Sequence, residues 1–147
     1  MCESNKNYMK VSFDARSVNE GFARMTVAAF MADMNPTLEE VADVKTAVSE
    51  AVTNAIVHGY SDENKQVELI CKREDEKLLI SVIDQGVGIE NVAEAMQPFY
   101  TTKPGQERTG MGFSFMEAFM DEVCVESRPG EGTAVHMVKR IERKDEQ

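Results

Sequence analysis

The segment best suited to chemistry is Glu50-Ala-Val-Thr-Asn54, in which a carboxylate and an amide lie four residues apart. In a helix this spacing places both side chains on one face, about 6 Å apart along the axis. An amide oxygen is a good ligand for Mg²⁺, which binds a few protein oxygens beside water and phosphate oxygens. A carboxylate one turn away can accept a proton from a hydroxyl that attacks a γ-phosphate. The spacing also fits an ordinary helix surface, so it indicates catalysis only together with further motifs.

A second motif, Asp84-Gln-Gly86-Val-Gly88, directly follows an apolar run. A carboxylate at the end of a strand can accept a hydrogen bond from an exocyclic amine such as that of adenine. The two glycines allow a tight backbone turn that a flat base can approach closely. An ordinary turn after a strand has the same composition.

A third motif, Thr109-Gly110-Met111-Gly112, precedes a helical pattern. Free backbone N–H groups at a helix start, together with the helix dipole, form an anion site suited to phosphates. Lys103 and Arg108 in the preceding polar loop can add positive charge. A flexible hinge with solvated basic residues is the alternative interpretation.

Alternating and helical patterns predict the elements that position these motifs. We expect strands over residues 8–13, 67–72, 77–84, 123–127 and 133–141. Helices are expected from 17 to about 35, from 37 to 58 with Gly59 as a left-handed cap, over 112–121, and as a short segment within 89–96. Capping boxes are expected at Ser17 with Glu20 and at Thr37 with Glu40. This order predicts an α+β fold, a two-layer sandwich in which helices cover one face of a mixed sheet, as one domain over residues 1–147.

The first expected helix is apolar on two sides. One stripe contains Val18, Phe22, Met25, Ala29 and Ala32, and the opposite one contains Val27, Phe30, Met31 and Met34, with Arg24 at its edge. Such a helix either lies inside the core or presents one side to another chain. We favour the second interpretation, because the domain has only two layers.

The composition excludes several classes of function and of location in the cell. The formal net charge of −10 disfavours binding to nucleic acid phosphates. Three widely spaced cysteines argue against disulfides or a zinc site and for a reducing compartment. Neither a signal sequence nor an apolar run of about 20 residues is present, so we expect a cytoplasmic protein without a membrane span.

In this order and at these separations, the three motifs resemble those of the GHKL ATPases, the group of gyrase B, histidine kinases and MutL. Residues 50–58 are similar to the N box, 84–88 to the first glycine box and 110–112 to a short second glycine box. Residues 98–100 look like the root of the ATP lid, and Gly132-Thr133 like the segment whose threonine reaches the adenine pocket. The greatest similarity is to bacterial anti-sigma factors that are also serine kinases, notably in EAVTNAIVHGY and ERTGMGFSFMEAFMDEV.

This resemblance implies a Bergerat-type fold that binds ATP or ADP with Mg²⁺. Glu50 becomes the general base, Asn54 the Mg²⁺ ligand and Asp84 the adenine anchor. Arg24 matches a family arginine that contacts both protein partners. The other nucleotide contacts expected are Gly86, Gly88, Lys103, Arg108, Thr109, Gly110, Met111, Gly112 and Thr133.

The resemblance also implies a homodimer that holds a sigma factor inactive while ATP is bound. It implies phosphorylation of a serine on an anti-anti-sigma protein, with ADP as the other product. The choice of a sporulation rather than a stress-response sigma factor rests on the resemblance alone.

A stand-alone histidine-kinase-type ATPase module is the alternative, but it requires a helical phosphoacceptor domain for which we expect no room. A nucleotide-gated module would need further domains, and a purely protein-binding member would not need the Glu50, Asn54 and Asp84 set. We expect a structural role for His58 and a solvent-facing position for His136.

Overall fold

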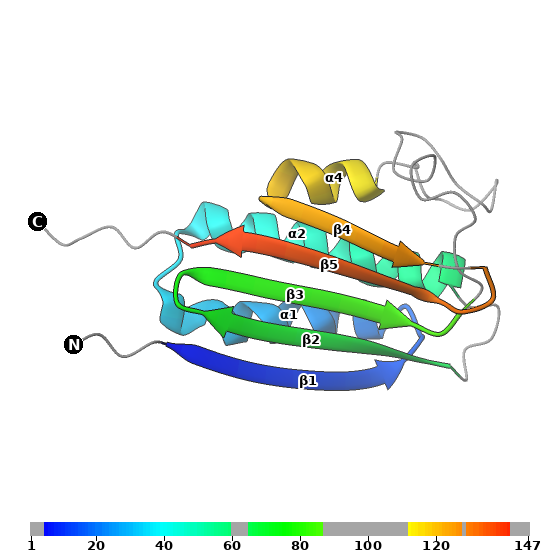
Figure 1. Cartoon of the computed structure of the whole chain (residues 1–147). Helices are drawn as coiled ribbons and strands as arrows, with labels where there is room; N and C mark the ends of the chain where they lie inside the picture. The colour runs from blue at the N-terminus through cyan, green and yellow to red at the C-terminus, as the bar shows by residue number, and fades with distance from the viewer. Residues whose placement is uncertain (1–4, 60–64, 87–111, 128, 142–147) are drawn as a thin grey trace, which may run out of the picture.

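A computed structural model describes residues 5–59, 65–86, 112–127 and 129–141 of the protein. Its five-stranded sheet has the order β1-β2-β3-β5-β4 and carries helices α1, α2 and α4 on one face (Figure 1). The strands are β1 Lys6–Asp14, β2 Gln66–Glu74, β3 Lys77–Asp84, β4 Glu122–Ser127 and β5 Thr133–Arg140. The helices are α1 Asn19–Met31, α2 Leu38–Asn54 and α4 Gly112–Phe119, with a 3-10 turn Ala32–Met34 and a π-helical turn Ala55–Gly59.

The two-layer α+β architecture is confirmed, but the expected mixed sheet is wrong. Every neighbouring pair among the described strands is antiparallel. The connection from β3 through α4 makes β4 run in the same direction as β3. However, β5 returns from β4 and lies between the two, pairing antiparallel with both. A helical connection normally places two parallel strands side by side. Here β3 and β4 are parallel but are not neighbours, because β5 lies between them.

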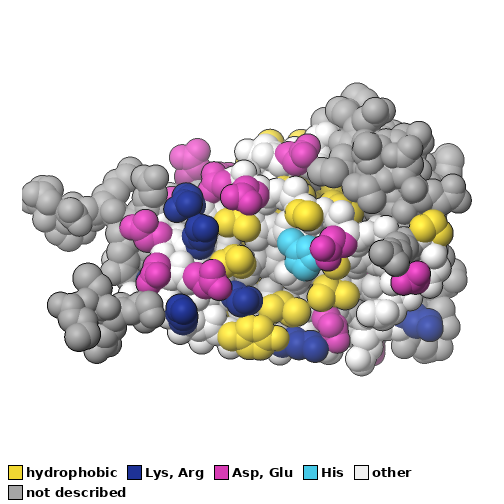
Figure 2. Space-filling view, in the orientation of Figure 1, with side chains coloured by type: hydrophobic (Ala, Val, Ile, Leu, Met, Phe, Trp, Pro, Cys, Tyr) yellow, Lys and Arg dark blue, Asp and Glu magenta, His cyan; other side chains and the backbone are white. Residues whose placement is uncertain are grey.

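The hydrophobic core lies between the sheet and the helices. Alternate residues of β3, namely Leu78, Ile80 and Val82, are buried toward the helical layer, as the period of two in a strand requires. None of the described helices covers the opposite face of the sheet (Figure 1), and Figure 2 shows basic, acidic and hydrophobic side chains interspersed there. His136 lies on this open face, 39% exposed, and bonds Ser81 at 2.7 Å and Glu126 at 3.2 Å. Its predicted orientation away from the core is confirmed.

Helix α1 presents one of its apolar stripes to the core and leaves the other exposed. Val27, Met31 and Met34 are fully buried, whereas Val18, Phe22 and Met25 of the opposite stripe are 70%, 54% and 61% exposed. Arg24 therefore borders the buried stripe rather than the exposed one. The prediction that one apolar side of this helix faces outward is confirmed.

The capping box expected at Ser17 is wrong. Helix α1 begins at Asn19, and its first residues have no side-chain cap. Glu20, the residue expected to complete the box, instead accepts a hydrogen bond from Ser49 of α2 and pairs with Arg24 at 3.1 Å. The Glu20 carboxylate therefore makes a tertiary contact with α2 instead of the local capping bond.

Helix α2 has the predicted start and a modified end. Thr37 accepts from the backbone N–H of Glu40 at 3.0 Å, and the Glu40 carboxylate accepts from the Thr37 N–H at 2.8 Å, so this capping box is confirmed. The helix continues beyond Asn54 into a π-helical turn that ends at Gly59. The left-handed cap at Gly59 stays a prediction. No described helix is both long and apolar enough to cross a membrane.

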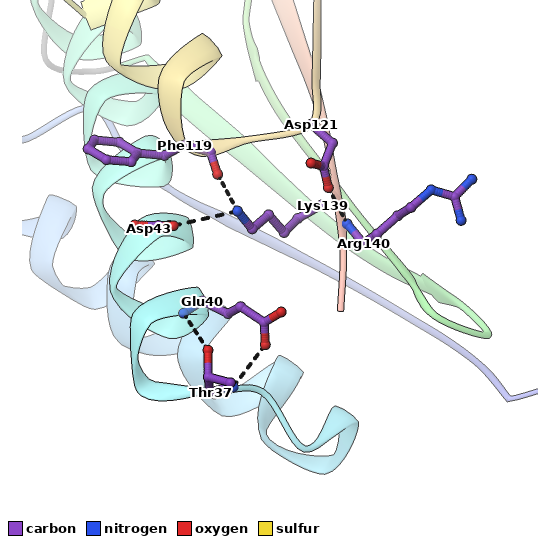
Figure 3. A network of polar contacts seen from close by, with 7 residues as sticks. All are labelled: Thr37, Glu40, Asp43, Phe119, Asp121, Lys139 and Arg140. Carbon is purple, nitrogen blue, oxygen red and sulfur yellow. Dashed lines mark hydrogen bonds and ion pairs between the residues drawn. The ribbon is translucent and has the colours of Figure 1, made fainter. Parts of the chain in front are cut away.

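The end of helix α4 is fixed by a polar network with α2 and β5 (Figure 3). The Lys139 ammonium donates to the carbonyl oxygen of Phe119 at 2.7 Å and lies 3.6 Å from the Asp43 carboxylate. Asp121 accepts from the backbone N–H of Arg140 at 2.7 Å. A cation on the unpaired carbonyls of a helix end stabilises that end. The start of α4, at Gly112, lies at the opposite end of the helix from this network.

Candidate functional site

The predicted site residues that the structure describes, Arg24 excepted, gather at one end of the molecule. The carboxyl ends of β3 and β4, the start of β5, the end of α2 and the start of α4 all lie there (Figure 1). The π-helical turn after α2 contacts β3, and α2 contacts α4. Folding thereby brings the end of α2, which carries Glu50 and Asn54, to the same side of the molecule as the end of β3, which carries Asp84 (Figure 1).

Asp84 is a buried carboxylate at the end of β3 whose pKa is perturbed. It is 5% exposed, and its Oδ1 accepts from the backbone N–H of Gly86 at 2.8 Å. Burial raises the pKa of Asp84 from 3.8 to about 6, while backbone N–H groups of Gly86 and Thr133 oppose the rise. A buried carboxylate with this orientation is suited to accept a hydrogen bond from a ligand.

Thr133 lies beside Asp84 and is held by a residue that the sequence analysis missed. Asp84 and Thr133 are directly opposite each other in the β3–β5 pair, and Thr133 is 9% exposed. The Ser127 and Thr133 hydroxyl oxygens are 2.7 Å apart, and Ser127 donates to the Gly132 carbonyl at 3.0 Å. The signal available in the sequence was the position of Ser127 at the end of one expected strand, opposite the start of the next.

A hollow of about 600 Å³ opens beside these groups. It is lined by the ends of β3, β4 and β5, including Asp84, Ser127 and Thr133. This volume falls within the range of small-molecule sites. Polar groups with fixed positions thus meet open space large enough for a ligand.

Gly132 is required by close packing at this site. Its φ is +85°, and a Cβ built on it would lie 2.1 Å from the Asp84 carbonyl oxygen. We expect Gly132→Ala to lower the free energy of unfolding by more than about 2 kcal/mol, because backbone strain and a clash combine. Displacement of Asp84 should also weaken ligand binding. Urea unfolding measures the first effect.

Gly130 provides the matched control for this substitution. Its φ is +80°, but a Cβ there would meet no atom within 4 Å. Gly130→Ala should therefore cost only the backbone term, about 1 kcal/mol. Equal losses in the two variants would show that the contact with Asp84 is unimportant.

Glu50 and Asn54 lie on the flank of α2 rather than in its core face. Val44, Val48, Ala51 and Val52 are buried, whereas Glu50 and Asn54 are half-buried. The π-helical turn starts directly after Asn54, and such turns occur frequently at functional sites. Among the described residues, no cluster of three or more His, Cys, Asp or Glu side chains is placed to hold a metal.

Several predicted site residues lie outside the part of the chain that the structure describes. They are Gly88, Lys103, Arg108, Thr109, Gly110 and Met111. The expected short helix within 89–96 and the lid root at 98–100 are outside it as well, as are the His58 side chain and Cys2. Gly112 is described and begins α4, as predicted. Cys71 and Cys124 are both free thiols, as expected from their spacing.

Arg24 lies on α1, one turn after Glu20, and is not among the residues that line the hollow beside Asp84. Its side chain is 41% exposed and its guanidinium pairs with Glu20 at 3.1 Å. Within the described part of the chain, Arg24 is linked toward the site through Glu20 and Ser49, the residue that precedes Glu50.

Comparison with known proteins identifies the class to which this fold and site belong. Residues 11–139 match the family model of the histidine kinase-like ATPase domain, so the chain carries an ATP-binding domain of this class. The anti-sigma F factor of Clostridium acetobutylicum is 53% identical over 92% of this chain and 95% of its own length. That of Geobacillus thermodenitrificans is 55% identical over 92% of this chain and 94% of its own. The chain belongs to the anti-sigma F factor family.

Solved structures support the same fold. The RsbU and RsbW domains of a Mycobacterium tuberculosis protein match with a TM-score of 0.66 and 22% identity, over 92% of this chain and 32% of that one. The catalytic domain of the histidine kinase ThkA matches with a TM-score of 0.58 and 17% identity, over 90% of this chain and 96% of its own.

Proposed function

We propose that the protein is an ATP-dependent anti-sigma factor and protein serine kinase. As a cytoplasmic homodimer, it binds a sporulation sigma factor and keeps that factor inactive. It also phosphorylates a serine of the anti-anti-sigma protein, with ADP as the other product. The observation that supports this proposal is the buried Asp84 paired with Thr133 on the side of the molecule where α2 also ends (Figure 1), in a chain whose relatives include anti-sigma F factors.

The adenine would bind in the hollow beside Asp84 and Thr133. The buried Asp84 carboxylate would accept a hydrogen bond from the exocyclic amine, which is why its fixed orientation by the Gly86 N–H is useful. The triphosphate would then extend toward the start of α4, whose N–H groups favour anions. Lys103, Arg108 and the Thr109–Gly112 segment supply the remaining expected contacts.

The donor set beside the proposed triphosphate fits Mg²⁺. Asn54 offers a neutral amide oxygen at the end of α2, and ATP would supply phosphate oxygens, a combination that this hard cation prefers. When bound, Mg²⁺ neutralises charge on the phosphates during transfer. Glu50 would take the proton from the attacking serine hydroxyl as the oxygen–phosphorus bond forms. The bond to ADP breaks, and the proton remains on the Glu50 carboxyl.

The exposed side of α1 is the proposed protein-binding face. Val18, Phe22 and Met25 are each more than half exposed, which is unusual for large apolar side chains in one stripe. Methionine adapts to different partners, which suits a protein that binds a sigma factor, an antagonist and a second copy of itself. Arg24 on the same helix adds a cation for acidic partner groups.

Arg24→Ala tests the role of this helix. We expect sigma factor capture to weaken by about tenfold or more, because a charged contact at an interface contributes about 1.5–3 kcal/mol. ATP affinity should stay within about twofold, since Arg24 does not line the hollow beside Asp84. Pull-down with purified sigma factor and calorimetry with ATP measure the two quantities. Undiminished capture would remove Arg24 from the interface.

The proposed activity itself is tested by mixing the protein with Mg-ATP and purified anti-anti-sigma protein. Mass spectrometry should locate phosphate on one serine of the acceptor, with an equal amount of ADP formed. ADP without phosphoserine would indicate an ATPase instead, and phosphate on a histidine of this chain would favour the histidine-kinase alternative.

A further inference from the structure

Helices α1 and α2 are joined by a polar contact next to the proposed base. The Ser49 hydroxyl donates to the Glu20 carboxylate, and the same Glu20 oxygen, Oε2, lies 3.1 Å from the Arg24 guanidinium. Ser49 is the residue immediately before Glu50. A continuous chain of contacts therefore runs from Arg24 on the proposed protein-binding helix to the backbone that carries Glu50.

The Glu20 carboxylate is well placed for a specific contact. Its side chain is only 22% exposed, and the bond to Ser49 is partly buried where α1 packs against α2. A hydrogen bond to an ionised carboxylate is about twice as strong as a neutral one, and exclusion of water strengthens it further. The carboxylate is used here and not in the helix cap that its sequence position favours.

Because of where Ser49 lies on α2, its contact with Glu20 can set the orientation of this helix. Successive residues of a helix point about 100° apart, so Ser49 meets α1 while Glu50 projects from a different side. The buried face of α2, which includes Val48 and Val52, is a third side of the helix and faces the core. Fixing Ser49 against α1 consequently fixes the rotation of α2 about its axis, and with it the direction of Glu50.

We infer that Glu20 is a positioning residue for phosphoryl transfer, acting on Glu50 through Ser49. Its partner Arg24 extends the connection along the proposed protein-binding helix, so a protein that contacts Arg24 acts on the same carboxylate that orients the base. This inference rests on the proposed kinase function. A displacement of about 1 Å in a reacting group is sufficient to slow a reaction about 100-fold, so a loose α2 should reduce turnover without unfolding the protein.

Four variants separate positioning from general stability. Glu20→Ala and Ser49→Ala each remove the contact, and Glu20→Gln keeps an oxygen that can accept from Ser49. Glu39→Ala is the control, because Glu39 is also in the first turn of its helix but is exposed at the start of α2, about three turns before Glu50. We expect kcat for phosphoserine formation to fall about tenfold in Glu20→Ala and Ser49→Ala. The affinity for ATP should stay within about twofold, and Glu20→Gln should recover most of the rate.

The double variant Glu20→Ala/Ser49→Ala should be no slower than either single variant, because both remove one contact. Additive losses, a normal kcat in Glu20→Ala, or an equal loss in Glu39→Ala would overturn the inference. Amide hydrogen exchange gives a readout that does not need the kinase reaction: residues 47–54 should exchange faster in Glu20→Ala than in Glu39→Ala. Unchanged exchange would contradict the inference even if transfer were slow. Absence of transfer by the wild-type protein would instead contradict the proposed function.

Discussion

Glu50→Gln is expected to reduce phosphoryl transfer to the acceptor serine by at least about 100-fold while ATP remains bound. The amide has almost the same shape as the carboxylate but cannot accept the serine proton at neutral pH. Glu50 is half-buried on the flank of α2, one turn from Asn54, so little packing should change. Single-turnover transfer with labelled ATP gives the rate, and calorimetry gives the affinity.

The control for this substitution is Glu39→Gln, which makes the same chemical change at an exposed position of the same helix. It should transfer phosphate at the wild-type rate. If Glu50→Gln also turned over normally, the proton would have to leave by another route and Glu50 would not be the base. If Glu50→Gln lost ATP binding instead, its role would be in holding the nucleotide.

Asp84→Asn should have the second large effect: a more stable protein that binds ATP about 10- to 100-fold more weakly. Hydrogen bonds to a charged partner contribute about 1.5–3 kcal/mol, and the variant loses that charge at the proposed adenine pocket. It also removes a carboxylate that is costly to keep ionised at 5% exposure. A gain in stability with a loss of binding is the behaviour expected of a functional residue.

The sign of the stability change follows from the pKa of Asp84. Burial raises this pKa from 3.8 to about 6, so the folded protein binds the proton more tightly than the unfolded chain does. The penalty to the free energy of unfolding is fully present above about pH 6. It disappears as the pH falls from about 6 to about 4. Asp84→Asn should therefore be more stable at neutral pH by up to about 3 kcal/mol, with the difference shrinking across that window.

Urea unfolding at several pH values checks the stability, and nucleotide titration checks the binding. The ratio of wild-type to Asp84→Asn affinity should fall as the pH drops through about 6, because Asp84 becomes neutral. Taking the ratio cancels titration of the phosphates, which is common to both proteins. A ratio independent of pH, or a variant that binds ATP normally, would contradict the role of Asp84.

The elements that local sequence determines were predicted well. The strand 77–84 has a clear period of two and was predicted at its observed bounds. The start of α2 was predicted because Thr37 and Glu40 satisfy each other without help from the rest of the chain. Asp84 was recognised because it ends the strand 77–84, directly after its apolar residues.

The features that the sequence did not reveal depend on tertiary contacts. Glu20 has the spacing of a capping residue, but its carboxylate meets Ser49, a partner that only the packing of α1 on α2 supplies. Periodicity revealed two apolar stripes on α1 but could not show which of them faces the sheet. The stripe that has Arg24 at its edge is the buried one. Ser127 became part of the site only through strand pairing with Thr133.

The position of β5 between β3 and β4 has a consequence for biosynthesis. Among the five strands it comes last in sequence, yet it alone joins β4 to β3, and it contributes Thr133 beside Asp84. While a ribosome is still adding residues 133–140, the sheet is divided and the pocket lacks one wall. We therefore expect a nascent chain to be unable to retain nucleotide until this strand has left the exit tunnel. Fragments that stop earlier should be substrates for cellular proteases.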